Sequence, residues 1–306
     1  MGQHDVVALH EDQVSVETRV VRRLVDEQFT QWVGLPLREV ATGGTVNAIF
    51  RIGDHLAARF PLRDQPAAEV RAWLAAEGAA AAEFAGASTV PAPELVALGA
   101  PGHGYPMPWG VQTWVPGHDA TVDNPGDSLE FATDLAGLIT AMRGVDMRGR
   151  VFEGRGRGGH LPDHDAWMAT CFNHSEGLLD VARLTTIWAD LRELPEVDAD
   201  VMTHGDLTPA NVLVEAGRLA GVLDAGGFAP ADPALDLVAA WHLLDAGPRD
   251  VLRSSLGCGE VTWRRGIAWA FQQSIGAVWY YAKSHPVMSN WAHRTLDRIL
   301  AADELR

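Results

Sequence analysis

Residues 202–236 read MTHGDLTPANVLVEAGRLAGVLDAGGFAPADPALD. Asp206, Asn211 and Asp224 lie in this stretch beside short apolar runs of β-prone residues. The runs 211–214 and 219–223 are separated by four residues, a spacing typical of a β-hairpin. We therefore predict that the three polar side chains converge at one edge of a small sheet.

This set of side chains suits phosphoryl transfer. Moving a γ-phosphoryl group requires a carboxylate that orients the attacking hydroxyl and accepts its proton, and hard oxygen ligands for Mg²⁺. Asp206 is the candidate base, and Asn211 and Asp224 are the candidate metal ligands. His-Gly-Asp alone is a weak signal, and Asp224 alone would more often form a turn. The prediction therefore rests on the combination and its spacing.

The spacing also resembles that of a known family. Four residues separate Asp206 from Asn211, as in the catalytic loop of protein kinases, and Asp224-Ala225-Gly226 stands where kinases have Asp-Phe-Gly. Together with the later Asp-Pro-Ala-Leu-Asp, the chain resembles the aminoglycoside phosphotransferase family over about residues 40–300.

The resemblance implies an α+β, bilobal, protein-kinase-like fold. We expect a small β-rich N-terminal nucleotide-binding lobe over residues 1–112, a hinge over 113–117, and a larger, mostly helical C-terminal lobe over 118–306 that carries catalysis and substrate binding. It also implies that Asp236 braces the catalytic loop, and His204 is assigned the same supporting role.

Asp232 has a simpler expected role. It precedes Pro233, and proline is favoured in the first turn of a helix, where an aspartate often caps the N-terminus. We therefore expect Asp232 to be a helix cap and not a metal ligand.

The nucleotide-binding residues are expected in the N-terminal lobe. Gly43 and Gly44 form a turn before the strand-like runs 46–52 and 55–60, and a glycine turn lets backbone N–H groups approach phosphates. In the resembling family this turn covers the phosphates, and Asn47 falls on a frequent family position. An ordinary turn is an equally good interpretation of these glycines.

The lobe contains no lysine, since Lys283 is the one lysine of the chain. A kinase-like lobe holds phosphates with a cation on its third strand, paired with a carboxylate on the next helix. The candidate cation is Arg59, and its predicted partner is Glu69 on a helix expected over 66–84. Arginine stays charged and offers a planar fork to phosphate or carboxylate. A surface role for Arg59 is the alternative.

The hinge is placed at Thr113, Trp114 and Val115, where the resemblance implies backbone contacts to the nucleobase. Backbone contacts leave little trace in a sequence, so ATP and GTP both remain possible co-substrates.

The C-terminal lobe is predicted to be helical apart from a glycine-rich segment. Residues 149–159 read GRVFEGRGRGG; Arg155 and Arg157 could contact phosphate, but we expect a mobile surface loop. Aromatic residues gather in the penultimate helix, mostly as core. The helices are expected over 127–142, 167–194, 233–245, 249–256, 260–283 and 286–300.

Composition limits the other possibilities. The chain has 306 residues, a net charge of −16, two cysteines, no apolar run long enough for a membrane span, and no signal-peptide pattern. We expect a cytoplasmic enzyme that binds neither nucleic acid nor membrane. Between residues 160 and 200 lie nine acidic residues; they could attract a cationic substrate, but a solvated face is the preferred interpretation.

The expected function is that of a small-molecule kinase using Mg²⁺ and either ATP or GTP. The acceptor is expected to be a hydroxyl group of an antibiotic, an aminoglycoside before a macrolide 2'-hydroxyl or another amino-alcohol. A nucleotide-binding module without catalysis is the further alternative, favoured only by arginine in place of lysine at position 59.

Overall fold

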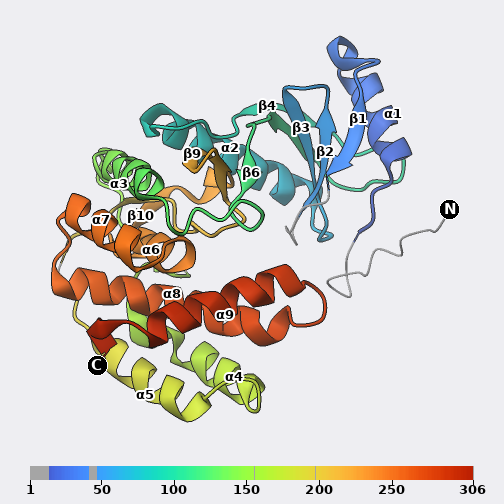
Figure 1. Cartoon of the computed structure of the whole chain (residues 1–306). Helices are drawn as coiled ribbons and strands as arrows, with labels where there is room; N and C mark the ends of the chain where they lie inside the picture. Colours follow the sequence, from blue (N-terminus) through green and yellow to red (C-terminus); the bar gives the residue numbers. More distant parts are fainter. Residues whose placement is uncertain (1–13, 41–46, 155, 197, 306) are drawn as a thin grey trace. The chain divides into compact units, whose positions relative to one another are not determined.

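The computed structural model describes residues 14–40, 47–154, 156–196 and 198–305. The chain divides into two compact units, Met1–Ala82 with Pro93–Val115, and Glu83–Ala92 with Pro116–Arg306. The first unit contains the main sheet and the second contains most of the helices (Figure 1), so the predicted α+β class is confirmed.

The second unit includes residues 83–92, which the predicted lobe boundary had placed in the first. The ring of Phe84 packs against the rings of His204 and Phe228, and Val222 donates its N–H to the carbonyl of Pro91 at 3.0 Å. These contacts tie the end of the long helix and the segment after it to the strands near residue 222.

The first unit is built on a five-stranded antiparallel sheet of order β1-β2-β3-β5-β4. The predicted hairpin of the second and third strands is present, and Gly53 supplies the left-handed turn residue with φ of 57°. The strands are β1 (Leu37–Val40), β2 (Asn47–Ile52), β3 (Leu56–Pro61), β4 (Leu95–Gly99) and β5 (Trp109–Thr113).

Aromatic side chains form the core of this unit. The ring of Phe60 stacks on that of Trp109 at 4.7 Å and meets the edge of Phe50 at 5.8 Å. The helices are α1 (Thr18–Gln28) and α2 (Ala67–Ala87). Before α1, the N–H of Val14 bonds to the carbonyl of Leu62 at 2.7 Å.

Two small sheets carry the loops of the second unit. The antiparallel set β6 (His118–Asp119), β8 (Val212–Glu215) and β9 (Arg218–Val222) contains the predicted hairpin, and β7 (Val201–Thr203) pairs with β10 (Ala229–Ala231). The hairpin turn uses Ala216 and Gly217, both with positive φ, as a two-residue turn with the favoured twist requires.

Helices make up the rest of the second unit, and α8 packs against α4, α5, α6 and α9. The helix predicted over 167–194 is two helices, because Gly177 turns the chain with φ of 78° and Asp180 caps the second helix. The helices of this unit are α3 (Leu129–Arg143), α4 (Asp165–Ser175), α5 (Val181–Leu191), α6 (Val238–Leu243), α7 (Ala246–Leu256), α8 (Glu260–Tyr280) and α9 (Pro286–Leu300). Its 3-10 turns are Leu161–His164, Ala225–Gly227, Leu235–Leu237 and Asp303–Leu305, and Thr30–Trp32 is a 3-10 turn of the first unit.

None of the helices in the described ranges combines the length and apolar content that a membrane crossing requires.

Candidate active site

Asp206 and Asn211 lie on the loop between β7 and β8, and their side chains are in contact. The amide Nδ2 of Asn211 donates to Oδ2 of Asp206 at 2.8 Å and to its backbone carbonyl at 3.0 Å. The loop is tightened by two further turns, because Thr208 donates its N–H to the carbonyl of Asp206 and Asn211 donates to that of Thr208. The structure thus brings the predicted base and one predicted metal ligand together.

Asp224 follows β9 and is tied to the same loop through its neighbour. Leu223 donates its N–H to the carbonyl of Asn211 at 2.7 Å, next to the pairing of β8 with β9. Asp224 is exposed and adopts the left-handed conformation, with φ of 58° and ψ of 40°. Aspartate and asparagine tolerate this region better than most residues. The conformation ends the strand at Asp224, beside Asn211.

His204 joins these two segments. Its Nε2 lies 2.9 Å from the carbonyl of Leu223, which can only accept, so this nitrogen carries the proton. Its Nδ1 then accepts the backbone N–H of Asp206 at 3.2 Å. The buried ring is therefore a bridge between the base-bearing loop and the end of β9.

Asp236 holds the beginning of the same loop. Its carboxylate accepts the N–H of His204 at 3.1 Å and that of Gly205 at 2.9 Å. Burial raises the pKa of this carboxyl above its usual value, while the nearby His204 and the two N–H groups act in the opposite direction. The contacts place Asp236 as a brace of the loop, the role that the resemblance implies.

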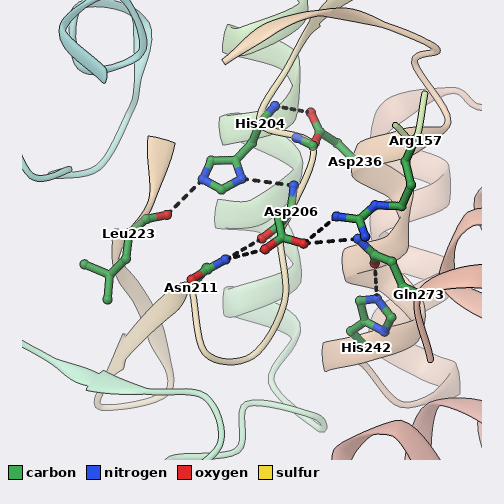
Figure 2. Close-up of polar contacts among 9 residues, drawn as sticks. Arg157, His204, Asp206, Asn211, Leu223, Asp236, His242 and Gln273 are labelled. Carbon is green, nitrogen blue, oxygen red and sulfur yellow. Dashed lines mark hydrogen bonds and ion pairs between the residues drawn. The ribbon is translucent and has the colours of Figure 1, made fainter. Parts of the chain in front are cut away.

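The two other side chains that hold the base were not predicted. Nη2 of Arg157 lies 2.9 Å from Oδ1 of Asp206, and Nε2 of Gln273 on α8 donates to the same oxygen at 3.2 Å (Figure 2). The side chains of Arg157 and Asp206 are 33% and 42% exposed, so solvent reaches the pair. Three donors therefore orient the carboxylate of Asp206.

His242 on α6 fixes the orientation of Gln273. The amide nitrogen of Gln273 must face the carboxylate, so its Oε1 faces Nε2 of His242 at 2.7 Å, and that nitrogen must donate. Nδ1 of His242 lies 3.1 Å from the hydroxyl of Thr295 on α9. Burial lowers the pKa of His242 to about 3, so the ring is neutral at physiological pH and can play this part.

The described parts of the glycine-rich segment, residues 149–154 and 156–159, are anchored at several points, which its composition did not indicate. Phe152 donates its N–H to Asp200, and Arg150 forms two hydrogen bonds to Glu83 at 2.7 and 2.8 Å. A Cβ added at Gly158 would lie 2.6 Å from that of Ala231. Gly158 and Gly159 therefore permit close packing, which composition alone does not distinguish from mobility.

Asp232 completes the anchoring of this segment, and its Oδ1 also accepts the N–H of Ala234 at 2.9 Å, as the predicted cap requires. Its N–H bonds to the carbonyl of Gly158 at 2.8 Å, and its Oδ2 accepts from Arg265 at 2.7 Å and from Trp269 at 2.9 Å. Arg265 in turn donates to the carbonyl of Gly159 at 3.0 Å. Residues 235–237 form a 3-10 turn and α6 begins at Val238, so the element after Asp232 starts as a 3-10 turn and not as the α-helix predicted over 233–245.

In the first unit, Arg59 lies on β3 as predicted, but its carboxylate partner differs. Nη1 of Arg59 is 3.8 Å from Oε2 of Glu77 and 3.5 Å from Oε1 of Gln112. Glu69 is exposed in the first turn of α2. Eight residues of helix separate the two glutamates, about 12 Å along the axis. The sequence pattern located the helix but not the turn that faces Arg59.

Some of the remaining residues predicted to bind nucleotide lie within the described ranges and others do not. Gly43 and Gly44 lie outside the described residues, and Asn47 begins β2. Thr113 exchanges two hydrogen bonds with Glu94, and Trp114 donates its N–H to the carbonyl of His55. Of the three predicted hinge residues, Val115 is the one whose N–H makes no backbone hydrogen bond within the described ranges.

The donor set at Asn211 and Asp224 fits Mg²⁺. The amide nitrogen of Asn211 is used by Asp206, which leaves its Oδ1 as a ligand, and Asp224 adds a carboxylate. No cluster of three or more His, Cys, Asp or Glu side chains suited to a metal occurs among the described residues. Mg²⁺ commonly uses one or two protein groups and completes its shell with phosphates and water.

Comparison with known proteins identifies the family. A model described as the phosphotransferase enzyme family matches residues 37–269. The chain belongs to this family. It is a phosphotransferase that acts on hydroxyl groups. No curated protein matches the sequence.

Solved structures with the same fold are distant in sequence. The GDP complex of aminoglycoside 2'-phosphotransferase-IIIa is 16% identical with a TM-score of 0.68, covering 93% of this chain and 99% of that one. The macrolide 2'-phosphotransferase MphH from Brachybacterium faecium is 20% identical with a TM-score of 0.59, covering 89% and 97%. These likenesses support the protein-kinase-like fold of the phosphotransferase.

Proposed function

We propose that this phosphotransferase moves the γ-phosphoryl group of ATP or GTP to a hydroxyl group of an antibiotic, with an aminoglycoside as the expected acceptor. A macrolide 2'-hydroxyl or another amino-alcohol is the alternative. The observation that carries the proposal is the contact between Asp206 and Asn211, which puts a base beside a ligand for the metal. Similar structures are described as a GDP and kanamycin complex and as macrolide 2'-phosphotransferases.

The open side of Asp206 indicates where the acceptor hydroxyl binds. A carboxylate offers about four lone-pair positions. Arg157 and Gln273 both donate to Oδ1, whereas among the described residues Asn211 is the one that donates to Oδ2. The hydroxyl therefore donates to the remaining position on Oδ2, and its proton passes there as the oxygen attacks phosphorus. Mg²⁺ held by Asn211 and Asp224 would neutralise phosphate charge when bound.

The acidic segment 160–200 does not help to choose the acceptor. Seven of its nine acidic side chains have partners within the second unit, so these seven side chains have structural roles. They are Asp163 with His160, Asp165 and Glu193 with Arg192, Asp180 with the N–H of Arg183, Asp190 with Arg264, Asp198 with Thr262, and Asp200 with the N–H of Phe152. The choice of acceptor therefore rests on the similar enzymes.

A nucleotide-consumption screen tests the proposal. ATP and GTP are supplied separately with aminoglycosides, macrolides and metabolic amino-alcohols, and phosphorylated products are identified by mass spectrometry. We expect one antibiotic class to be phosphorylated, and Asp206→Ala to abolish turnover while Mg-nucleotide binding persists. Phosphorylation of amino-alcohol metabolites alone would reject the antibiotic assignment, and full activity of Asp206→Ala would reject the base.

A further inference from the structure

The guanidinium of Arg157 has more hydrogen-bonding capacity than the protein uses. Its Nη2 donates to Oδ1 of Asp206 at 2.9 Å, while its Nε is buried and has no hydrogen-bond partner within the described ranges. A guanidinium carries five N–H donors in a fixed plane. The donors of Arg157 that the protein leaves unused are therefore available to an acceptor on a bound ligand.

Two donors besides Arg157 orient the carboxylate of Asp206. Gln273 donates to the same oxygen, and Asn211 donates to the other. Neutral His242 holds Gln273 in the required orientation. The carboxylate thus remains fixed when Arg157 turns away, so the guanidinium can exchange this contact for one with a substrate.

The segment that carries Arg157 is anchored on both sides of it. Gly158 and Gly159 are bonded through their carbonyls to Asp232 and Arg265. Arg150 is paired with Glu83 before it. Because the backbone is held on both sides, the side chain of Arg157 reaches a defined position. Catalytic groups require a defined position, and surface groups that contact only solvent do not.

The charges around Arg157 point to the ligand it receives. The two nearby imidazoles, His164 and His242, both have a pKa lowered first by burial and further by the charge of Arg157, so both favour the neutral form. Asp206 is therefore the anion that balances Arg157 among the described residues. A hydroxyl that donates to Asp206 lies beside this guanidinium, and so does the anionic phosphoryl group that the hydroxyl attacks.

We propose that Arg157 is a catalytic residue that binds the transferring phosphoryl group. This rests on the proposed nucleotide-dependent transfer but not on the identity of the acceptor. The acceptor oxygen forms a bond to the γ-phosphorus as the bond from that phosphorus to the β–γ bridging oxygen breaks. The electron pair leaves with the nucleoside diphosphate, and the hydroxyl proton goes to Asp206. The N–H groups of Arg157 bind the non-bridging oxygens, where the negative charge resides.

The test compares Arg157→Met and Arg157→Lys with wild type, and uses Arg148→Met as a control that removes an exposed arginine near the same segment. Three quantities are measured: acceptor phosphorylation, slow hydrolysis of the nucleoside triphosphate by water, and binding of the nucleoside diphosphate with and without aluminium fluoride. The diphosphate–fluoride complex imitates the phosphoryl group in transfer, so its affinity reports contacts made in the transition state.

We expect Arg157→Met to lower kcat by about 100- to 1,000-fold with little change in the KM for nucleotide, as for other donors to transition-state charge. Affinity for the diphosphate–fluoride complex should fall in parallel, affinity for the diphosphate alone should not change, and Arg157→Lys should be intermediate. Arg148→Met should behave as wild type.

Wild-type affinity of Arg157→Met for the fluoride complex, or a rise in acceptor KM as its main effect, would overturn the assignment. An equal loss in Arg148→Met would assign the effect to the net charge of the segment. If no antibiotic is phosphorylated, hydrolysis and the fluoride complex still report on Arg157, so the antibiotic assignment fails separately. Wild-type protein that neither hydrolyses nucleotide nor binds the complex would overturn both proposals.

Discussion

The carboxylate of Asp236 accepts the backbone N–H of Gly205 at 2.9 Å, one residue before Asp206, the proposed base. Gly205 has φ of 79°, so the chain turns sharply here out of β7. The second oxygen of Asp236 accepts the N–H of His204. A buried side chain distant in sequence therefore fixes the turn that aims Asp206.

Asp236→Asn should weaken this turn although it preserves size. An amide has one oxygen, so its NH₂ group would face an N–H of His204 or Gly205, and a buried donor would lose its acceptor. We expect unfolding to become easier by about 1 to 3 kcal/mol. We also expect kcat to fall more than the KM for nucleotide changes. Urea denaturation and steady-state kinetics measure both, with the exposed Asp163→Asn as control.

The buried pair of Asp232 and Arg265 should contribute far more to stability than the exposed pair one residue away in sequence. Arg265 and Asp232 have side chains 2% and 9% exposed, whereas Arg264 contacts Asp190, which is 70% exposed. Arg265→Met leaves a buried carboxylate without its cation and should cost about 3 to 5 kcal/mol. Arg264→Met should cost about 0 to 1 kcal/mol. Comparable losses in the two variants, measured in urea, would contradict this ranking.

The sequence predicted the residues whose spacing is local, and missed those set by tertiary packing. Asp206, Asn211 and Asp224 lie on one hairpin and its flanking turns, so chain geometry alone brings them together. Gln273 reaches Asp206 from a helix 67 residues away, and no local pattern marks that contact.

The errors have the same origin. Helical periodicity located α2, but Glu69 and Glu77 are both compatible with it, and only the packing of the first unit selects Glu77. Arg157 lies in a glycine-rich run, where the sequence does not tell whether glycine permits mobility or close packing. The groups that anchor this run, the N–H of Asp232 and the half-buried carboxylate of Asp200, become evident only from the fold.

Acidification should destabilise the protein through His242. Its pKa is lowered to about 3 in the folded state, while the unfolded side chain has its ordinary value of about 6.5. Between these values the unfolded state binds more protons, so stability is fully present above about pH 6.5 and is lost as the pH falls toward 3. Between pH 7.5 and 5, His242 should account for about 2 kcal/mol of lost stability.

The His242 contribution is isolated by comparing pH dependences and not absolute stabilities. His242→Asn should lose stability less steeply than wild type between pH 7.5 and 5 in urea titrations. His160→Asn, at an exposed site, should keep the wild-type slope. Parallel curves for wild type and His242→Asn would show that the buried imidazole is not the group responsible.

The last prediction concerns the cation of the first unit. We expect Arg59 to contact the nucleotide phosphates, so Arg59→Ala should weaken nucleotide use by about 2 to 3 kcal/mol, measured as kcat/KM for ATP or GTP. Because Oε2 of Glu77 lies 3.8 Å from Arg59 while Glu69 is exposed in the first turn of α2, Glu77→Gln should raise the nucleotide KM and Glu69→Gln should not. The glutamates share one helix and one chemistry, so each substitution controls for the other. A larger effect of Glu69→Gln would restore the partner expected from the sequence and contradict the pairing in the structure.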